Sequence, residues 1–446
     1  MRMRITVLGG GLAGCEAVWQ LVKRGIRVRL VEMKPERFSP AHGSADLGEL
    51  VCSNSFRSAS LNSAAGLLKE EMRMMDSLIL SAADAVTVPA GKALAVDREG
   101  FSHFITEQLS RNALVSLERK EITRIPGVDE GMVIVATGPL TSDSLADDIA
   151  RSLGSEGLSF YDAIAPIVDA DSLDMGKLFT ASRYEEGEGD YLNAAMDEAT
   201  YRNFVDAIVS AKKVDPYPFE KIPHFEGCLP IEEIARRGPE TLAFGPMKPV
   251  GLTDPATGRR PYAVVQLRAE NRDKTLYNLV GFQTKMTHGE QERVFRTIPG
   301  LESATFARLG SIHRNTYLDS PRLLDEFSRS KALPHVFFAG QITGVEGYIE
   351  SAASGLIVGI MAGLLACGVT PAPPPSSTAA GGLLKHTRDT ASKRYEPMNV
   401  NFGLMDPPPP GTGKKRKKEV VAARAIADTR KWIDRIDGLR QSATIP

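Results

Sequence analysis

The sequence predicts an α/β protein whose main domain is a doubly wound parallel sheet, and a short N-terminal pattern carries most of this prediction. Residues 4–8 form an apolar run typical of a buried strand, a glycine-rich loop follows, and a helical pattern continues to about Arg24. Gly25 ends that helix, and residues 26–32 have the pattern of a second strand. Strand, helix and strand in this order predict a βαβ unit that opens the sheet.

The domain organisation follows from where this pattern is interrupted and resumed. From about Glu185 the chain becomes acidic and glycine-rich, and mixed strands with proline-rich turns continue to about residue 329. We therefore expect an inserted α+β domain over 186–329, with residues 1–185 and 330–446 forming the first domain. The tail after about residue 406 is expected to be flexible, although a helix is predicted near its end.

Composition and charge limit the classes of function. The chain has 446 residues, a hydrophobic fraction of 42% and a formal net charge of -1, so any nucleic-acid surface must be a local patch. The 4 cysteines are scattered without a CxxC pair, which argues against a metal site and a disulfide framework and favours a reducing, cytoplasmic location. Residues 352–369 are uncharged, but they are rich in small residues and predict a buried helix rather than a membrane span. No membrane association and no obligate protein partner are expected.

A nucleotide site is predicted where the first strand meets the first helix. The sequence GGGLAG fits GxGxxG, in which the glycines permit a tight turn, close approach of a pyrophosphate and close helix packing. Glu32, at the end of the second strand, has the spacing expected of a carboxylate that holds ribose hydroxyls. The predicted nucleotide-binding residues of the loop are Gly9, Gly10, Gly11, Leu12, Ala13 and Gly14.

Two later segments indicate that the nucleotide is FAD. An apolar strand over 132–136 ends at Thr137 and Gly138, and another over 336–339 enters Gly340 and Gln341. Both resemble cofactor contacts of glutathione-reductase-type flavoproteins, so we interpret the first domain as an FAD-binding domain of that type. Gln341 stands where an acid is usual. Tyr348, just before the apolar helix, is expected to line the flavin.

Two cysteines are candidates for catalysis. Cys52 and Cys228 each lie in a turn rather than on an apolar face, with basic residues such as Arg57 and Arg236 nearby in sequence. Exposure and neighbouring positive charge are what make a thiol reactive. The alternative for each is a small buried hydrophobic residue, and sequence alone leaves both open.

Several segments, taken together, resemble one family. They are residues 49–55 (ELVCSNS), 66–72 (GLLKEEM), 89–98 (PAGKALAVDR), 225–232 (FEGCLPIE), 244–252 (FGPMKPVGL) and 340–348 (GQITGVEGY). This set is similar to TrmFO, the bacterial folate- and FAD-dependent tRNA (uracil-5-)-methyltransferases, and the resemblance runs from Ile5 to about Gly403.

The resemblance implies methylation of C5 of the T-loop uridine, position 54 of tRNA, with methylenetetrahydrofolate as carbon donor. Reduced FAD would be the reductant, recharged by NADH or NADPH, and Cys52 and Cys228 would be the two functional thiols. A thiolate is needed because addition to C6 of uracil makes C5 nucleophilic. Our hypothesis is that Cys228 adds to C6 and Cys52 handles the C5 proton. Exchange of these roles stays an alternative.

Contacts to the other substrates are less specific in the sequence. His313 and Arg314 are candidates for folate, and a polar turn between strands is the alternative. Lys414, Lys415 and Arg416 are candidates for tRNA phosphates, and a solvated tail is the alternative. Three other functions also stay open: the same chemistry on ribosomal RNA, wobble-uridine modification by a related flavoprotein, and a flavin-bound RNA-binding protein without turnover.

Overall fold

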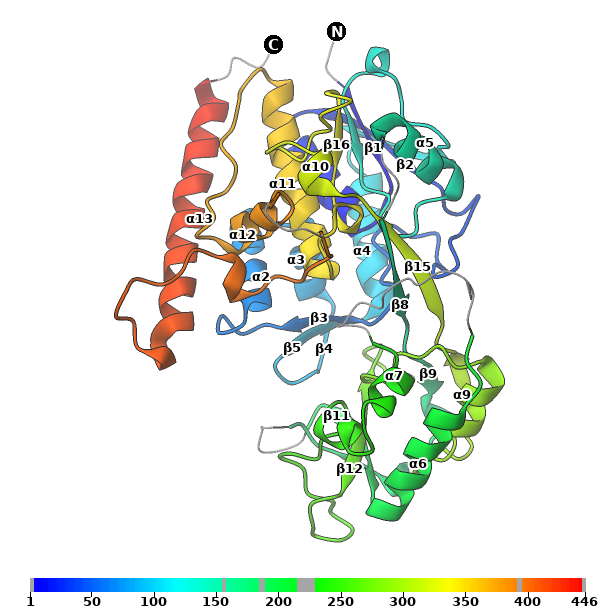
Figure 1. Cartoon of the computed structure of the whole chain (residues 1–446). Helices are drawn as coiled ribbons and strands as arrows, with labels where there is room; N and C mark the ends of the chain where they lie inside the picture. Colours follow the sequence, from blue (N-terminus) through cyan, green and yellow to red (C-terminus); the bar gives the residue numbers. More distant parts are fainter. Residues whose placement is uncertain (1–3, 155–157, 184–188, 215–228, 391–394, 443–446) are drawn as a thin grey trace.

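The computed structural model describes residues 4–154, 158–183, 189–214, 229–390 and 395–442. Figure 1 shows two bodies, each built on its own sheet, joined by the long strands β8 (Leu158–Ala163) and β15 (Ile312–Tyr317). These two strands pair with each other in antiparallel fashion. The upper body contains the N-terminal sheet, and the chain leaves it and returns to it along this ribbon.

The N-terminal sheet is five-stranded and parallel, in the order β16-β7-β1-β2-β6. Helix α1 (Leu12–Lys23) connects β1 to β2, which makes the predicted βαβ unit. The doubly wound fold is confirmed, and the strands are β1 (Arg4–Leu8), β2 (Arg27–Glu32), β6 (Val115–Arg119), β7 (Val133–Val135) and β16 (Val336–Phe338).

Helices cover both faces of this sheet because its strands are apolar on both sides. Val7 and Leu30 point into the core shared with α1, whereas Leu8 and Val31 point to the opposite core. Helix α5 (Asp143–Leu153) covers the second face with Leu145, Ile149 and Leu153.

The apolar helix α11 (Tyr348–Ala366) packs along α1 rather than facing solvent. It is long and apolar enough to cross a membrane, but 89% of its most apolar window is buried inside the protein. A Cβ at Gly355 would lie 2.0 Å from the carbonyl oxygen of Ala13, so a small residue here allows the two helices to approach closely. The predicted core helix is therefore present, beginning at Tyr348.

The second body is built on a six-stranded sheet in the order β10-β11-β12-β13-β9-β14. Its core includes Tyr201, Phe204 and Phe295 from helices on one side of the sheet. Strands from residue 167 onward join this sheet, and the paired strands β8 and β15 lead into and out of it. We therefore propose boundaries of about 158–317 for the inserted domain, which starts and ends earlier than 186–329. The strands are β9 (Ile167–Asp169), β10 (Leu178–Thr180), β11 (Tyr191–Met196), β12 (Ala263–Ala269), β13 (Leu276–Leu279) and β14 (Phe306–Arg308). The helices are α6 (Glu198–Ser210), α7 (Ile231–Arg236), α8 (Thr241–Phe244) and α9 (His288–Phe295).

A small sheet and several helices complete the first body. The three-stranded sheet β3-β5-β4 lies on the side that faces the second body (Figure 1). Its strands are β3 (Ser55–Ser58), β4 (Thr87–Val88) and β5 (Ala93–Val96). The remaining helices of this body are α2 (Ala64–Met74), α3 (Leu78–Ala85), α4 (Arg98–Ser110), α10 (Ser320–Leu323) and α12 (Ala379–His386).

The segment after residue 406, expected to be flexible, contains the long helix α13 (Lys417–Ser442). Its apolar residues, among them Val421, Ala425 and Trp432, are buried in the main core of the first body. The indole Nε1 of Trp432 also donates to the carbonyl of Ala372 at 2.8 Å. This helix is therefore packed against the first domain along its length (Figure 1).

Candidate functional site: a nucleotide loop and an arginine-lined thiol

The glycine loop has the geometry that close approach to a phosphate requires. Gly9 has a φ of +97°, a region that side chains rarely tolerate, and a Cβ at Gly14 would lie 1.8 Å from the Gly9 carbonyl oxygen. By contrast, a Cβ at Gly11 would meet no atom within 4 Å, so it faces open space. The first amides of α1 have no preceding helical carbonyl to bind and are free to face an anion.

Glu32 lies at the carboxyl end of β2 and closes one side of this space. It is 7% exposed. One carboxylate oxygen accepts from the Gly10 amide at 2.6 Å and the other from the Lys34 amide at 3.0 Å. Each oxygen retains a lone pair, so the carboxylate is fixed in place while still able to accept from hydroxyl groups. The loop and Glu32 therefore fit the adenosine and pyrophosphate parts of a dinucleotide.

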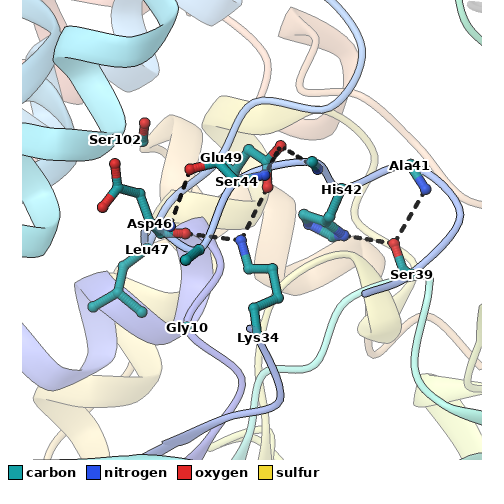
Figure 2. A network of polar contacts seen from close by, with 12 residues as sticks. Gly10, Lys34, Ser39, Ala41, His42, Ser44, Asp46, Leu47, Glu49 and Ser102 are labelled. Atoms are coloured by element: carbon teal, nitrogen blue, oxygen red, sulfur yellow. Dashed lines mark hydrogen bonds and ion pairs between the residues drawn. The ribbon is translucent and has the colours of Figure 1, made fainter. Parts of the chain in front are cut away.

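A pocket opens at this point and is lined by Gly9, Gly11, Glu32, Thr137 and their neighbours. Its outer wall is a polar network that the sequence did not reveal (Figure 2). Within it, the buried Lys34 Nζ contacts a carboxylate oxygen of Glu49 at 3.0 Å.

The same network holds the loop after β2. The other oxygen of Glu49 accepts from the amides of Gly43 and Ser44 at 2.8 and 3.1 Å (Figure 2). The side chain of His42 meets Ser39 Oγ at 2.6 Å, and burial followed by the charge of Lys34 lowers its pKa. A neutral imidazole and a paired lysine therefore form this wall of the pocket.

The two predicted flavin segments lie at the ends of neighbouring strands β7 and β16. Gly138 has a φ of +70° and open space at its Cβ position, and Gly340 has a φ of +83°. Gln341 donates from its amide to a carboxylate oxygen of Glu346 at 2.7 Å. A carboxylate, that of Glu346, therefore lies beside Gln341, although it comes five residues after the position where an acid is usual.

Tyr348, the first residue of α11, connects the flavin segments to the candidate thiol. Its hydroxyl accepts from the Cys52 amide at 2.6 Å, and its ring lies 5.9 Å from that of Phe56. Burial raises the pKa of this phenol, and Cys52 raises it further. Tyr348 is therefore a neutral phenol that fixes the loop carrying Cys52.

Cys52 is partly exposed, and three arginines, Arg98, Arg268 and Arg308, surround its loop; we call them the arginine cluster. Arg98 donates to the Cys52 carbonyl at 3.3 Å. Arg98 also forms an ion pair with Glu270 at 2.7 Å. Arg308 donates to the neighbouring Val51 carbonyl.

These arginines come from both bodies. Arg98 begins α4 in the first body, whereas Arg268 lies on β12 and Arg308 on β14 of the second. More than 150 residues separate Arg98 from the other two arginines, so no local pattern links the three. The only available signal is that Arg98 closes the motif segment 89–98.

A second buried polar group lies behind the same loop. Lys69 is fully buried and donates to the Phe56 carbonyl at 2.7 Å. Burial, then the charge of Arg57, lowers its pKa to about 7. Arg57 pairs with Glu350, a fully buried carboxylate of α11. Burial raises the pKa of this carboxylate more than the charge of Arg57 lowers it. These contacts tie the loop after Cys52 to α2 and α11.

The remaining candidates lie elsewhere or beyond the described residues. Cys228 lies outside the described part of the chain. His313 and Arg314 lie on strand β15, opposite Asp162 and Tyr161, rather than in a turn; their side chains are outside the description. Residues 414–416 form an exposed turn at the start of α13.

The fold and the glycine loop define the class of protein as a two-domain dinucleotide-binding protein of the doubly wound type. Residues 4–369 match the family described as GIDA, glucose inhibited division protein A. The chain belongs to this family and, within it, to the group of relatives named TrmFO.

Curated relatives match over nearly the whole chain. The protein of Geobacter sulfurreducens is 58% identical over 96% of this chain and 98% of its own length, and it is named methylenetetrahydrofolate–tRNA-(uracil-5-)-methyltransferase TrmFO. The protein of Syntrophus aciditrophicus, 56% identical over 96% of this chain and 97% of its own length, has the same name. The solved structure of GidA from Aquifex aeolicus has a TM-score of 0.68 at 15% identity, covering 98% of this chain and 75% of that chain. That likeness concerns the fold.

Proposed function

We propose that the protein methylates C5 of the T-loop uridine at position 54 of tRNA. Methylenetetrahydrofolate donates the carbon, and reduced FAD, recharged by NADH or NADPH, is the reductant. One observation of the structure carries this proposal: the Cys52 amide is bonded to Tyr348, which begins the helix next to the flavin segments. A reactive thiol beside a flavin site is what uracil methylation with a flavin reductant requires. The name of the relatives supports the same reaction.

The first domain provides a site that fits FAD. The loop residues Gly9, Gly10, Gly11, Leu12, Ala13 and Gly14 hold the pyrophosphate, and Glu32 accepts from the ribose hydroxyls. Thr137, Gly138, Gly340, Gln341 and Tyr348 hold the remainder. When bound and reduced, FAD supplies the hydride that completes the methyl group.

The two thiols activate the uracil base. Cys228 adds to C6, and the negative charge that develops makes C5 nucleophilic. Cys52 then takes the proton that C5 loses when its bond to the new carbon has formed. Cys228 leaves C6 with the electron pair of its C–S bond as the C5–C6 double bond is restored. The alternative is that the two thiols exchange these roles.

The other substrates bind around this centre. His313 and Arg314 contact folate, and Lys414, Lys415 and Arg416 contact tRNA phosphates. The T-loop uridine must leave its stack to reach a thiol of the protein. The protein works in the cytoplasm without an obligate protein partner. It also works without a membrane, and the burial of α11 in its core supports this part of the proposal.

The direct test is synthesis of 5-methyluridine. Purified protein is incubated with unmodified tRNA, methylenetetrahydrofolate and NADPH, and the nucleosides are analysed by mass spectrometry. Product is expected from the wild type and from Cys367→Ala, a control thiol at the end of α11. It should be lost in Cys52→Ala and Cys228→Ala.

The alternatives predict other outcomes. If 5-methyluridine formed in ribosomal RNA but not in tRNA, ribosomal RNA would be the substrate of the same reaction. Modification of a wobble uridine would indicate the activity of the related flavoprotein. RNA binding with no product on either substrate would leave a flavin-bound RNA-binding protein.

A further inference from the structure

The arginine cluster places more positive charge around Cys52 than the surrounding acids balance. Arg98, Arg268 and Arg308 carry three positive charges, and Glu270 carries one negative charge, which leaves two unbalanced. Arg268 is 6% exposed and Glu270 is 3% exposed, so solvent screens these charges poorly. The local charge therefore favours an anion at the centre of the cluster.

Hydrogen bonds do not relieve this excess. Nε of Arg268 donates to the Asn54 side chain at 2.8 Å, but its buried Nη2 atom has no hydrogen-bond partner among the described residues. The contacts that the cluster makes to the loop are to the neutral carbonyls of Leu50, Val51 and Cys52. The cluster thus holds the loop in place without neutralising its own charge.

Three groups near the cluster in the described part of the chain can become anions in addition to Glu270. Tyr191 acts on Arg268, and its hydroxyl donates to the Ala90 carbonyl at 3.0 Å. Two groups remain. One is Tyr348, whose pKa is raised by burial, so its phenol stays neutral near pH 7. The other is Cys52, whose ionised form favours the charged state of Arg98, Arg268 and Arg308. Coulomb interactions are reciprocal, so the three guanidinium groups favour the thiolate equally.

We propose that Arg98, Arg268 and Arg308 keep Cys52 as a thiolate at neutral pH and are positioning residues of the reaction. The inference rests on the proposed function in assigning a proton-accepting role to Cys52. A thiolate accepts the C5 proton directly and becomes a thiol, and the electron pair of the C–H bond stays on carbon. A neutral thiol would have to lose its own proton first.

The test measures the ionisation of Cys52 in the FAD-bound protein, without tRNA or folate. Alkylation by iodoacetamide is followed against pH, and the Cys52 peptide is quantified by mass spectrometry. The ultraviolet absorption of the thiolate, taken as the difference between wild type and Cys52→Ala, gives the same midpoint. This measurement does not require a reagent to reach the sulfur. We expect a midpoint below about 7.5, against about 8.5 for an ordinary cysteine.

The variants Arg98→Gln and Arg308→Gln should raise the midpoint by about one pH unit or more, which lowers the alkylation rate near pH 7 about tenfold. Arg308→Lys keeps the charge and should restore most of the shift. Arg293→Gln is the matched control, since this exposed arginine pairs with Glu290 on its own helix. It should leave the midpoint unchanged.

A wild-type midpoint at about 8.5 or above would overturn the inference even if the variants failed to fold. So would an unchanged midpoint in glutamine variants that retain FAD absorbance and the wild-type melting temperature. Because no RNA substrate is present, a low midpoint in a protein that makes no 5-methyluridine would refute the proposed function and leave the thiolate assignment standing.

Discussion

Replacing Gly14 by alanine should separate the packing role of the glycine loop from its role in binding FAD. The new Cβ would lie 1.8 Å from the Gly9 carbonyl oxygen and 3.0 Å from its carbon. Both are backbone atoms, so α1 must move away from the loop by more than 1 Å. Overpacking of this kind costs about 1–3 kcal/mol, and the upper end applies to a backbone clash. The better helix propensity of alanine returns about 1 kcal/mol, so a net loss of about 2 kcal/mol is expected.

The control is Gly11→Ala, whose Cβ would meet no atom within 4 Å. Its φ of -76° is one that alanine adopts readily, so the FAD-free protein should melt as the wild type does. FAD affinity should nevertheless fall, because the methyl group enters the space proposed for the pyrophosphate. The assays are melting of the FAD-free protein and FAD titration by flavin fluorescence. Equal melting of Gly14→Ala and wild type would refute the packing argument, and unchanged FAD affinity in Gly11→Ala would refute the phosphate site.

Three further outcomes follow from buried and exposed charges and from the tail. Burial, then Arg57, lowers the pKa of Lys69 to about 7, so the folded protein binds fewer protons than the unfolded chain up to the ordinary value of 10.5. In urea titrations the free energy of unfolding of the wild type should therefore rise relative to that of Lys69→Met as the pH rises from about 7 to 10.5. A difference between the two proteins that stays constant with pH would contradict a neutral lysine. Trp432→Ala should cost about 3–5 kcal/mol, whereas exposed Lys431→Ala should cost little, as measured by melting; equal melting of both would mean that α13 is not part of the core. Replacing all of residues 414–416 by alanine should weaken tRNA binding and reduce its salt dependence without changing melting, and an unchanged salt slope in filter binding would exclude this patch.

The last substitution tests the tail better than truncation does. Removing everything after residue 406 would also remove Val421, Ala425 and Trp432 from the main core. Loss of tRNA binding after such a truncation would then have two explanations, whereas the three exposed side chains can be changed without disturbing packing.

Local patterns predicted the N-terminal βαβ unit, which carries the proposed nucleotide site, well. The apolar strand, the glycines and the helix are close in sequence, and their periodicities differ, so β1, α1 and β2 were found nearly to the residue. Glu32 was placed at the end of its strand. Its bonds to the Gly10 and Lys34 amides were not predictable, because they depend on how the loop after β2 folds back.

Long-range contacts account for what the sequence did not reveal. The edges of the inserted domain were predicted from a change in composition near Glu185, but its sheet also takes strands from residue 167 onward. The tail was expected to be flexible because of its prolines and lysines. Its helix α13 nevertheless has an apolar stripe, which packs against α2. The arginine cluster forms only where helix α4 meets strands β12 and β14. No spacing along the chain predicts this meeting.

The position of Cys52 shows why the two bodies must be considered together. Asn54, two residues later, is fully buried, and its side-chain amide donates to Val96 in the first body at 2.8 Å and to Ala269 in the second at 3.0 Å. Its oxygen accepts from Arg268. The loop carrying the thiol is therefore bonded to both bodies at once, and the second body contributes two of the three arginines beside it. Loosening the contact between the bodies would move this charge away from the thiol. In the proposed mechanism the inserted domain therefore acts on Cys52 through electrostatics, in addition to any contact that it makes with RNA.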